Sequence, residues 1–296
     1  MRAVNEWNGY EKYIQKEDEK AMRTPFDIAE GYVEEGAKKA SQKTMKTIVL
    51  GMMAGMFIAF GACTSSVGAH LVQNAGLAKV VAGCIFPVGL MMIVFIGGEL
   101  FTGDCLMIMG CMRKKYNVLK LIEKLIVVFF SNLLGALIIV LLAYFCGQWE
   151  LSANALGAYT IKVALGKANL PFVKALCSGI LCNFIVCVAV LMGYAAKDVV
   201  GKVWGIFFPI LAFVVGGFEH CVANMYYIPA GIFAARNEAY RQAATEMYGI
   251  SEQAMANLDV AHMVSNLIPV TLGNIIGGMV LVALPLYYLH HENMKK

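Results

Sequence analysis

Four stretches of this chain contain no Lys, Arg, Asp or Glu over more than twenty residues. They are Thr47–Ala78, Leu125–Trp149, Ala175–Ala196 and Val260–His291. An α-helix needs about 20 residues to cross roughly 30 Å of hydrocarbon, so each stretch predicts a membrane-spanning helix. The composition agrees, because 59% of the residues are hydrophobic and only 15% are charged. That is too few charges to solvate the surface of a globular protein of this length.

Two further apolar runs are interrupted by polar residues. Val80–Gly98 precedes Glu99 and Asp104, after which Cys105–Met112 is again apolar; Val203–Phe218 precedes Glu219 and His220, after which Cys221–Ala235 is again apolar. We interpret these runs as two broken helices, which makes six crossings with the four continuous ones. The predicted fold class is therefore all-α integral membrane. A β-barrel is disfavoured because its strands alternate apolar and polar residues, whereas these runs are solidly apolar.

Six crossings put both termini on the same side of the membrane, and the basic residues indicate which side that is. Thirteen Lys or Arg residues lie on the side of the termini, and six lie on the opposite side: Lys79, Lys162, Lys167, Lys174, Arg236 and Arg241. The positive-inside rule then predicts a multi-pass protein of the cell membrane with both termini cytoplasmic. We expect a cytoplasmic N-terminal segment at 1–43 with an amphipathic helix, a channel domain at 44–290 and a short cytoplasmic tail at 291–296. Met1–Lys20 is charged throughout and lacks the apolar core of a signal peptide.

Several classes of function are disfavoured by the residues that are present. The net charge of +4 is dispersed rather than gathered in one stripe, so we expect no nucleic-acid partner. The nine cysteines are odd in number and form no Cys-x-x-Cys pair, which favours packing over a metal or disulfide framework. The chain contains no His-Glu-x-x-His and no Gly-x-Ser-x-Gly motif, so we expect neither an intramembrane enzyme nor a cofactor.

The chain also contains a weak internal repeat. Gly97-Gly98-Glu99-Leu100-Phe101 matches Gly216-Gly217-Phe218-Glu219-His220 at a spacing of 119 residues, and Asn132-Leu133-Leu134-Gly135-Ala136 matches Asn274-Ile275-Ile276-Gly277-Gly278 at 142. Each half contains three crossings, so the halves must be inverted relative to each other. Inverted repeats with broken helices at corresponding positions predict a binding site near the bilayer midplane. The alternative is a pair of ordinary kinked helices whose glycines serve packing.

Ionisable residues at both breaks favour the functional interpretation, because such groups are costly inside a membrane. His220 adjoins Glu219 at a double-glycine break, and we expect it to act on the substrate. We expect Glu219 to hold the backbone or His220 in place rather than to meet substrate. Asp104 is either functional or a cap of the short helix that follows it.

These residues resemble the formate/nitrite transporter family of pentameric channels. The resemblance rests on Leu100-Phe101-Thr102, on Gly217-Phe218-Glu219-His220 with Ala223-Asn224-Met225, on Cys182-Asn183-Phe184-Ile185-Val186-Cys187, and on Leu272–Gly278. It covers about Phe26 to Tyr288. The resemblance implies an aquaporin-like fold, a homopentamer in lipid with one pore in each protomer, and a small anion substrate that crosses with a proton.

The resemblance also implies roles for single residues. Thr102 and His220 would face each other in a small chamber between two apolar constrictions, with Asn183 and Asn224 lining or ordering it. Phe86 and Leu90 would form one constriction, and Leu100 and Phe213 the other. A lysine of the outer vestibule falls on Lys167; the residues after it, Ala168-Asn169-Leu170, depart from the family pattern, and Lys174 is a rival.

A mechanism follows from this arrangement of charges. An apolar constriction rejects a bare anion, because removing a charge from water is expensive. A basic vestibule nevertheless attracts the anion, and a weak acid can then cross in its neutral form. His220 is the candidate proton partner or gate, since its reference pKa of about 6.5 is near neutrality. Formate is the expected substrate, and nitrite and hydrosulfide are the alternatives. Small acids such as acetate or lactate rank behind these three.

Overall fold

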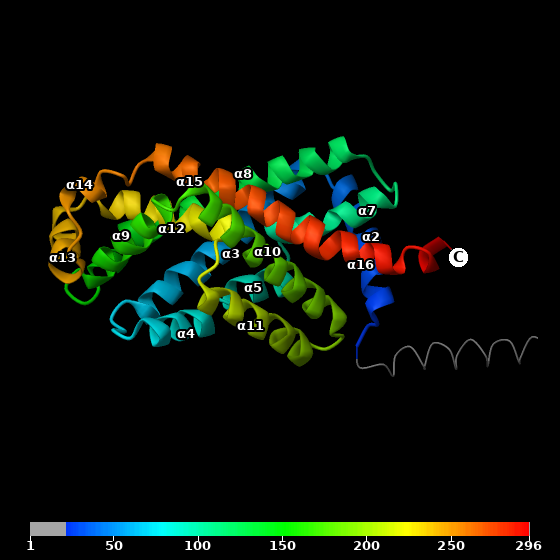
Figure 1. Ribbon diagram of the computed structural model, residues 1–296, viewed down its shortest axis with the longest axis horizontal. Helices are drawn as coiled ribbons and strands as arrows, with labels where there is room; N and C mark the ends of the chain where they lie inside the picture. Colours follow the sequence, from blue (N-terminus) through cyan, green and yellow to red (C-terminus); the bar gives the residue numbers. More distant parts are fainter. Residues whose placement is uncertain (1–21, 296) are drawn as a thin grey trace, which may run out of the picture.

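The computed structural model describes residues 22–295, and nearly all of this part of the chain is helical (Figure 1). Within it, six helical spans are long and apolar enough to cross a membrane, so the predicted six crossings are confirmed. The spans are α3 (Thr44–Ala69), α4 with α5 (Ala75–Ile85 and Val88–Ile96), α8 (Val118–Phe145), α10 (Phe172–Ala195), α11 (Val199–Gly216), and α15 with α16 (Val260–Ile275 and Leu284–His290). The prediction made for Met1–Lys20 concerns residues outside the described part of the chain.

Shorter helices connect and complete these spans. They are α2 (Pro25–Ser41), α6 (Phe101–Asp104), α7 (Ile108–Met112), α9 (Ala155–Ala168), α12 (Cys221–Ala234), α13 (Glu238–Tyr248) and α14 (Glu252–Met255). The amphipathic helix predicted before the first span is α2, which begins with a capping box at Thr24 and Asp27. The sequence did not predict α9 and α13. Helix α9 packs on α12 and α13.

Three of the spans begin at capping residues rather than where the charges stop. Asn117, Asp198 and Asp259 each accept a hydrogen bond from a backbone N–H in the first turn of α8, α11 and α15. Such a bond satisfies a donor that the helix leaves unpaired. Helix α8 therefore starts at Val118, seven residues before the predicted Leu125, and it carries Lys120, Glu123 and Lys124 in its first two turns.

Glycines allow the spans to pack closely in two pairs. A Cβ on Gly55 would lie 2.1 Å from the carbonyl oxygen of Asn132, and one on Gly135 would lie 2.0 Å from that of Met52, so α3 and α8 touch backbone to backbone. The same holds for α10 and α15, where a Cβ on Gly273 or Gly277 would lie 2.2 Å from a carbonyl oxygen of α10. Small residues at such crossings let membrane helices approach closely.

The outer surface of the bundle is apolar. Helix α8 exposes a row of large side chains over its whole length: Leu119, Ile122, Ile126, Phe130, Leu134, Leu141, Leu142 and Phe145. An apolar surface of this extent is expected to face lipid or another membrane protein rather than water.

The two described ends of the chain lie at the same end of the molecule. Figure 1 places α2, α7 and the C-terminus at one end of the long axis, and α13 and α14 at the other. This is the arrangement that an even number of crossings requires.

The sixth span differs from the continuous α-helix that its apolar run predicts. Between α15 and α16 the backbone forms an eight-residue π-helix, Ile276–Ala283. Short π segments are rare and occur frequently at functional sites. This one begins two residues after Asn274 and packs on α10.

Candidate functional site

Two spans are interrupted at the glycines that the sequence analysis singled out. Helix α5 ends at Ile96, Gly97 adopts φ +101°, and helix resumes at Phe101. Helix α11 ends at Gly216, Gly217 adopts φ +66°, and helix resumes at Cys221. Positive φ is strained for residues with a Cβ, which explains glycine at these two positions.

Each interruption is bound by one buried asparagine from a neighbouring span. Asn132 Nδ2 donates to the carbonyl oxygens of Gly51 (2.7 Å) and Glu99 (2.8 Å), and its Oδ1 accepts from Phe101 N–H (3.0 Å). Asn132 is 0% exposed, as is Asn274, which binds the second interruption. Backbone groups freed by a helix break must find partners inside the protein, because lipid offers none.

Asn274 makes the same three hydrogen bonds in the second half of the chain. Its Nδ2 donates to the carbonyl oxygens of Gly179 (2.8 Å) and Glu219 (3.0 Å), and its Oδ1 accepts from Cys221 N–H (2.9 Å). The two halves therefore hold their breaks in the same way.

These bonds correct the alignment of the two breaks by one residue. They pair Glu99 with Glu219 at a spacing of 120, whereas the glycine match used 119. The second break contains one more residue, Phe218, between its glycines and its glutamate. The counterpart of His220 is consequently Leu100, which has no polar side chain to cap a helix.

Thr102 and His220, which the resemblance places face to face, are in contact. Thr102 Oγ1 and His220 Nε2 are 2.9 Å apart, and the residues are 0% and 2% exposed. His220 Nδ1 accepts a hydrogen bond from Ala223 N–H at 3.0 Å and so caps α12. Because Nδ1 accepts, the ring is neutral with its proton on Nε2, which donates to Thr102. The Thr102 hydroxyl hydrogen is then available for an anion.

The four residues predicted to form constrictions lie along the same path, but they pair differently. Phe86 and Phe213 are in contact, with ring centroids 5.6 Å apart, and both line the cavity that His220 also lines. Leu90 and Leu100 line the cavity on the other side. The structure therefore groups Phe86 with Phe213 and Leu90 with Leu100, whereas the sequence analysis grouped Phe86 with Leu90.

We name the two cavities after the helices at their mouths. The α9 cavity, about 410 Å³, is lined by Phe86, Phe213 and His220 at its deep end and by Lys162 and Lys167 of α9. The α2 cavity, about 480 Å³, is lined by Leu90 and Leu100 at its deep end and by Lys39 of α2. His220 thus lines the α9 cavity with Phe86 and Phe213, and its partner Thr102 lies two residues after Leu100, which lines the α2 cavity.

Asn183 and Asn224 order the site rather than line either cavity. Asn183 Nδ2 donates to the carbonyl oxygens of Thr102 (3.2 Å) and Asn274 (2.7 Å). Asn224 Nδ2 donates to Glu219 Oε2 (2.6 Å) and Asn266 Oδ1 (2.8 Å). In the first half Gly55 is the counterpart of Asn183, and it packs on the Asn132 carbonyl without space for a side chain. The wider π turns after Asn274 accommodate Asn183 in the second half.

Lys167 forms an ion pair with Glu219, whose carboxylate binds the side chains of Lys167 and Asn224 rather than the backbone or His220. Lys167 Nζ is 2.9 Å from Glu219 Oε1 and 5.1 Å from the centroid of the Tyr227 ring. Both side chains of the pair are largely buried. Lys174, the rival candidate, is exposed and lines neither cavity.

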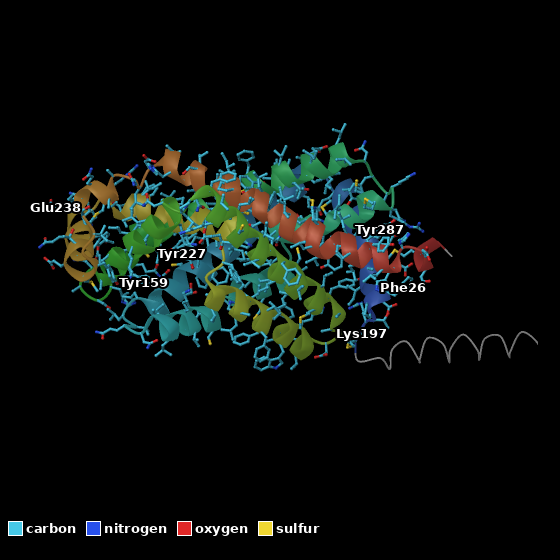
Figure 2. The ribbon with its side chains drawn as sticks, in the orientation of Figure 1. Phe26, Tyr159, Lys197, Tyr227, Glu238 and Tyr287 are labelled. Atoms are coloured by element: carbon cyan, nitrogen blue, oxygen red, sulfur yellow. The ribbon has the colours of Figure 1, made fainter. Side chains whose placement is uncertain are left out.

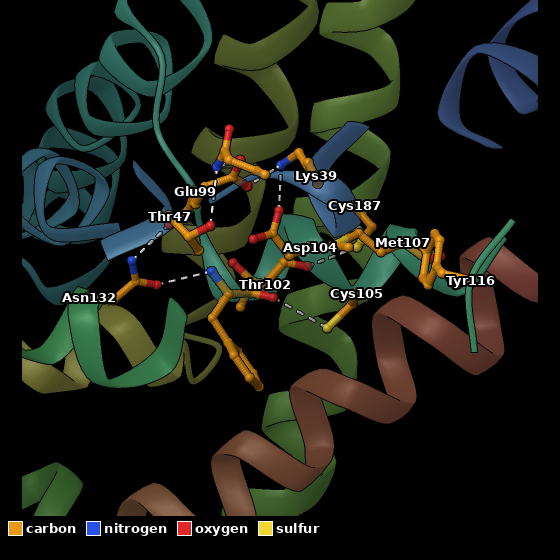
Figure 3. A network of polar contacts seen from close by, with 12 residues as sticks. Lys39, Thr47, Glu99, Thr102, Asp104, Cys105, Met107, Tyr116, Asn132 and Cys187 are labelled. Atoms are coloured by element: carbon orange, nitrogen blue, oxygen red, sulfur yellow. Dashed lines mark hydrogen bonds and ion pairs between the residues drawn. The ribbon is translucent and has the colours of Figure 1, made fainter. Parts of the chain in front are cut away.

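The sequence analysis missed the matching ion pair at the other mouth. Lys39 Nζ lies 2.6 Å from Glu99 Oε2 and 2.5 Å from Asp104 Oδ1 (Figure 3). Burial alone would lower the pKa of Lys39, but the Asp104 and Glu99 carboxylates hold it above its ordinary value. Asp104 makes no capping bond, which excludes the second of the two alternatives left open for it, a cap of the short helix that follows.

One signal in the sequence identifies Lys39. Lys39 and Lys167 are 128 residues apart, as are Gly51 and Gly179, the residues that Asn132 and Asn274 bind. The repeat therefore begins at α2 and α9, before the first span of each half.

Comparison with known proteins identifies relatives over nearly the whole chain. The model of the formate/nitrite transporter family matches residues 26–288. A probable formate transporter of Methanothermobacter thermautotrophicus is 37% identical over 292 residues, covering 91% of this chain and 98% of its own. The formate channel FocA of Haemophilus influenzae is 37% identical over 272 residues, covering 90% and 94%.

Solved structures resemble the fold as well. An ion channel of the FNT family superimposes with a TM-score of 0.77 at 25% identity, covering 89% of this chain and 98% of its own. A pentameric formate channel with formate bound superimposes with a TM-score of 0.74 at 30% identity, covering 84% and 98%. With the family model matched from the start of α2 to the end of the sixth span, the chain belongs to the formate/nitrite transporter family.

Proposed function

We propose that this protein is a membrane channel for small monovalent anions of weak acids, with formate as its main substrate. The observation that carries the proposal is the buried contact between Thr102 and His220, enclosed by the Phe86–Phe213 pair and by Leu90 with Leu100. The Thr102 hydroxyl, whose oxygen accepts from the imidazole N–H, offers its hydrogen to a carboxylate inside an otherwise apolar passage. Relatives named as formate transporter and formate channel support this substrate.

The apolar pairs determine the form in which the substrate crosses. Moving an anion from water into an apolar passage costs a large desolvation free energy, and protonation removes most of that cost because the acid is neutral. His220 is a neutral hydrogen-bond donor in this geometry, so the proton enters with the substrate. Charging the ring would put a proton on Nδ1 and break the cap of α12. We therefore assign His220 and Thr102 the role of polar contacts for a substrate that becomes neutral.

We further propose that five protomers assemble, each with its own pore, in the cell membrane with both termini cytoplasmic. The pentameric formate channel supports the assembly, and the excess of basic residues on the side of the termini supports the orientation. The apolar outer face of α8 is suited to contact lipid or a neighbouring protomer.

A substrate panel on purified protein in liposomes tests the proposal. Formate, nitrite, hydrosulfide and lactate are supplied outside, and entry is followed by internal pH and by membrane current. We expect formate to enter fastest and to compete with the others. Faster entry of nitrite or hydrosulfide than of formate would assign the channel to that anion, and no entry of any of them would refute the proposal.

A further inference from the structure

The two mouths of the passage differ in charge. The α2 cavity is lined by three basic residues and three acidic ones: Arg23, Lys39, Lys202, Glu35, Glu99 and Asp104. The α9 cavity is lined by Lys79, Lys162 and Lys167, and no Asp or Glu is among its lining residues. One mouth is therefore charge-balanced, and the other is basic.

Lys167 does not supply the excess charge of the α9 cavity. Its ammonium is 2.9 Å from the Glu219 carboxylate, which offsets it. Lys79 and Lys162 have no carboxylate within 4 Å among the described residues, and both are exposed. The uncompensated positive charge of this mouth therefore lies on Lys79 and Lys162.

Neighbouring groups hold both ammonium groups at the mouth. Lys79 Nζ is next to Gly217, where an added Cβ would lie 2.9 Å from it, at the C-terminal end of α11. The partial negative charge of a helix C-terminus favours a cation there. Lys162 Nζ lies 4.2 Å from the centroid of the Tyr248 ring. Tyr159 and Tyr227, which line the same cavity, lie toward the α13 end of the molecule in Figure 2.

We propose that Lys79 and Lys162 form an anion-collecting site at the α9 mouth, in front of the Phe86–Phe213 pair. The ligand class is a small monovalent anion, and the site rests on the proposed function as a channel. Each uncompensated charge about 10 Å from the anion raises the local anion concentration by about two- to fivefold at low ionic strength. The site is distinct from the Lys167–Glu219 pair, whose charges cancel.

The charge difference has a specific kinetic consequence. A passive channel obeys detailed balance, so the ratio of maximal rate to half-saturating concentration is the same in both directions. Charge at one mouth therefore changes the half-saturating concentration on that side, rather than making the channel one-way. We expect formate presented to the α9 mouth to saturate at a lower concentration than formate presented to the α2 mouth.

The test compares both sides of the membrane in a host without formate channels of its own. Initial formate entry is measured in intact cells and in inverted vesicles, for the wild type and for Lys79→Gln/Lys162→Gln. At an ionic strength of about 10 mM, with osmolality kept by sucrose, we expect a three- to tenfold rise in half-saturating concentration on one side only. At about 0.5 M salt the rise should disappear, because the Debye length is then only a few ångströms.

Lys202→Gln is the matched control, since Lys202 lines the α2 cavity. This variant should raise the half-saturating concentration on the other side, which identifies the two mouths independently of any assumed orientation. The collecting site is refuted if the wild type conducts and the double variant leaves the half-saturating concentration unchanged on both sides or raises it equally on both. It is also refuted if the rise on one side is as large at high salt as at low salt. If the wild type does not conduct, the proposed function itself fails.

Discussion

The Thr102 hydroxyl and the His220 ring lie 2.9 Å apart, although the two residues come from different broken spans and are separated by 118 residues. Each is placed by an asparagine of another helix. Asn132 binds the N–H of Phe101, directly before Thr102, and Asn274 binds the N–H of Cys221, directly after His220. The contact at the centre of the passage is therefore set by two backbone anchors in the two halves of the chain.

Replacing His220 by Asn tests where the proton of the transport step resides. The hydrogen bonds of His220 make the ring neutral, so we expect pH dependence to arise from the substrate, whose protonated fraction rises as pH falls. His220→Asn should keep a capping oxygen for α12 and still conduct faster at pH 5 than at pH 8. The measurement is formate-driven internal pH change together with membrane current over this range.

Loss of that pH dependence in His220→Asn would contradict this prediction and support titration of the imidazole, as the sequence alone suggested. The control is Thr102→Val, which removes the hydroxyl but leaves the histidine. It should lower the rate and leave the direction of the pH dependence unchanged.

Asn183→Ala tests whether this residue positions Thr102. The variant loses the bonds to the carbonyl oxygens of Thr102 and Asn274, while its neighbours in α10 stay packed. One lost hydrogen bond corresponds to about 1 kcal/mol, so we expect formate entry to slow by about fivefold. Asn257→Ala is the control: it loses a solvent-exposed hydrogen bond to Asn169 and should leave entry unchanged. Formate entry at the wild-type rate in the intact oligomer would show that Asn183 serves packing alone.

Pairs of substitutions at the constrictions test how the four apolar residues are grouped. When two constrictions lie in series, either one alone excludes a larger acid, so the acid passes only after both have been widened. Phe86→Val/Phe213→Val widens only one level, so lactate entry relative to formate should change little. Phe86→Val/Leu90→Val widens both levels, so lactate entry should rise.

The opposite ranking of the two double variants would restore the grouping predicted from the sequence. Valine is chosen because it keeps a branched apolar side chain and leaves a smaller cavity than alanine does. Size-exclusion chromatography identifies the variants that retain their oligomer, and only these enter the comparison.

Much of the fold follows from the charge-free runs, because lipid permits few alternatives to a helix of about 20 apolar residues. Helix ends were harder to predict. Asn117 extends α8 seven residues beyond its charge-free run, because it caps the helix, Lys120 pairs with Glu123, and the buried Lys124 donates to the carbonyl oxygen of Gln42. The π turns follow Asn274, whose carbonyl oxygen accepts a hydrogen bond from Asn183 of another span, and no periodicity in the sixth span reveals them.

The centre of the site was predicted through the family motifs, whereas its supports were not. Lys39 precedes the first span and pairs with Glu99 and Asp104 some 60 residues later, so only the 128-residue repeat connects it to Lys167. The pairing of Phe86 with Phe213 depends on the depth of each helix in the bundle, which sequence offsets do not supply.

Reporter fusions test the orientation of the spans. Figure 1 places α2, the C-terminus and the connection after α7 at one end. A reporter after Lys296 and one within Arg113–Tyr116 should therefore both appear cytoplasmic. A third, inserted in the turn at Gly249–Ser251 between α13 and α14, should appear on the opposite face. Finding the first two on different faces would contradict the six-span assignment.

Lys167→Ala tests whether this lysine attracts anions or stabilises the fold. The variant leaves the largely buried Glu219 carboxylate without its cation, and breaking such a pair destabilises by about 3 kcal/mol. We expect a lower unfolding temperature and lower formate entry, with little dependence of the loss on ionic strength.

Lys167→Ala/Glu219→Gln removes the unpaired charge and should recover most of the stability. Lys174→Ala is the matched control, and it should change neither quantity. A loss of entry that appears only at low ionic strength, with stability unchanged, would instead make Lys167 an anion-attracting residue, because only an uncompensated charge is screened in that way.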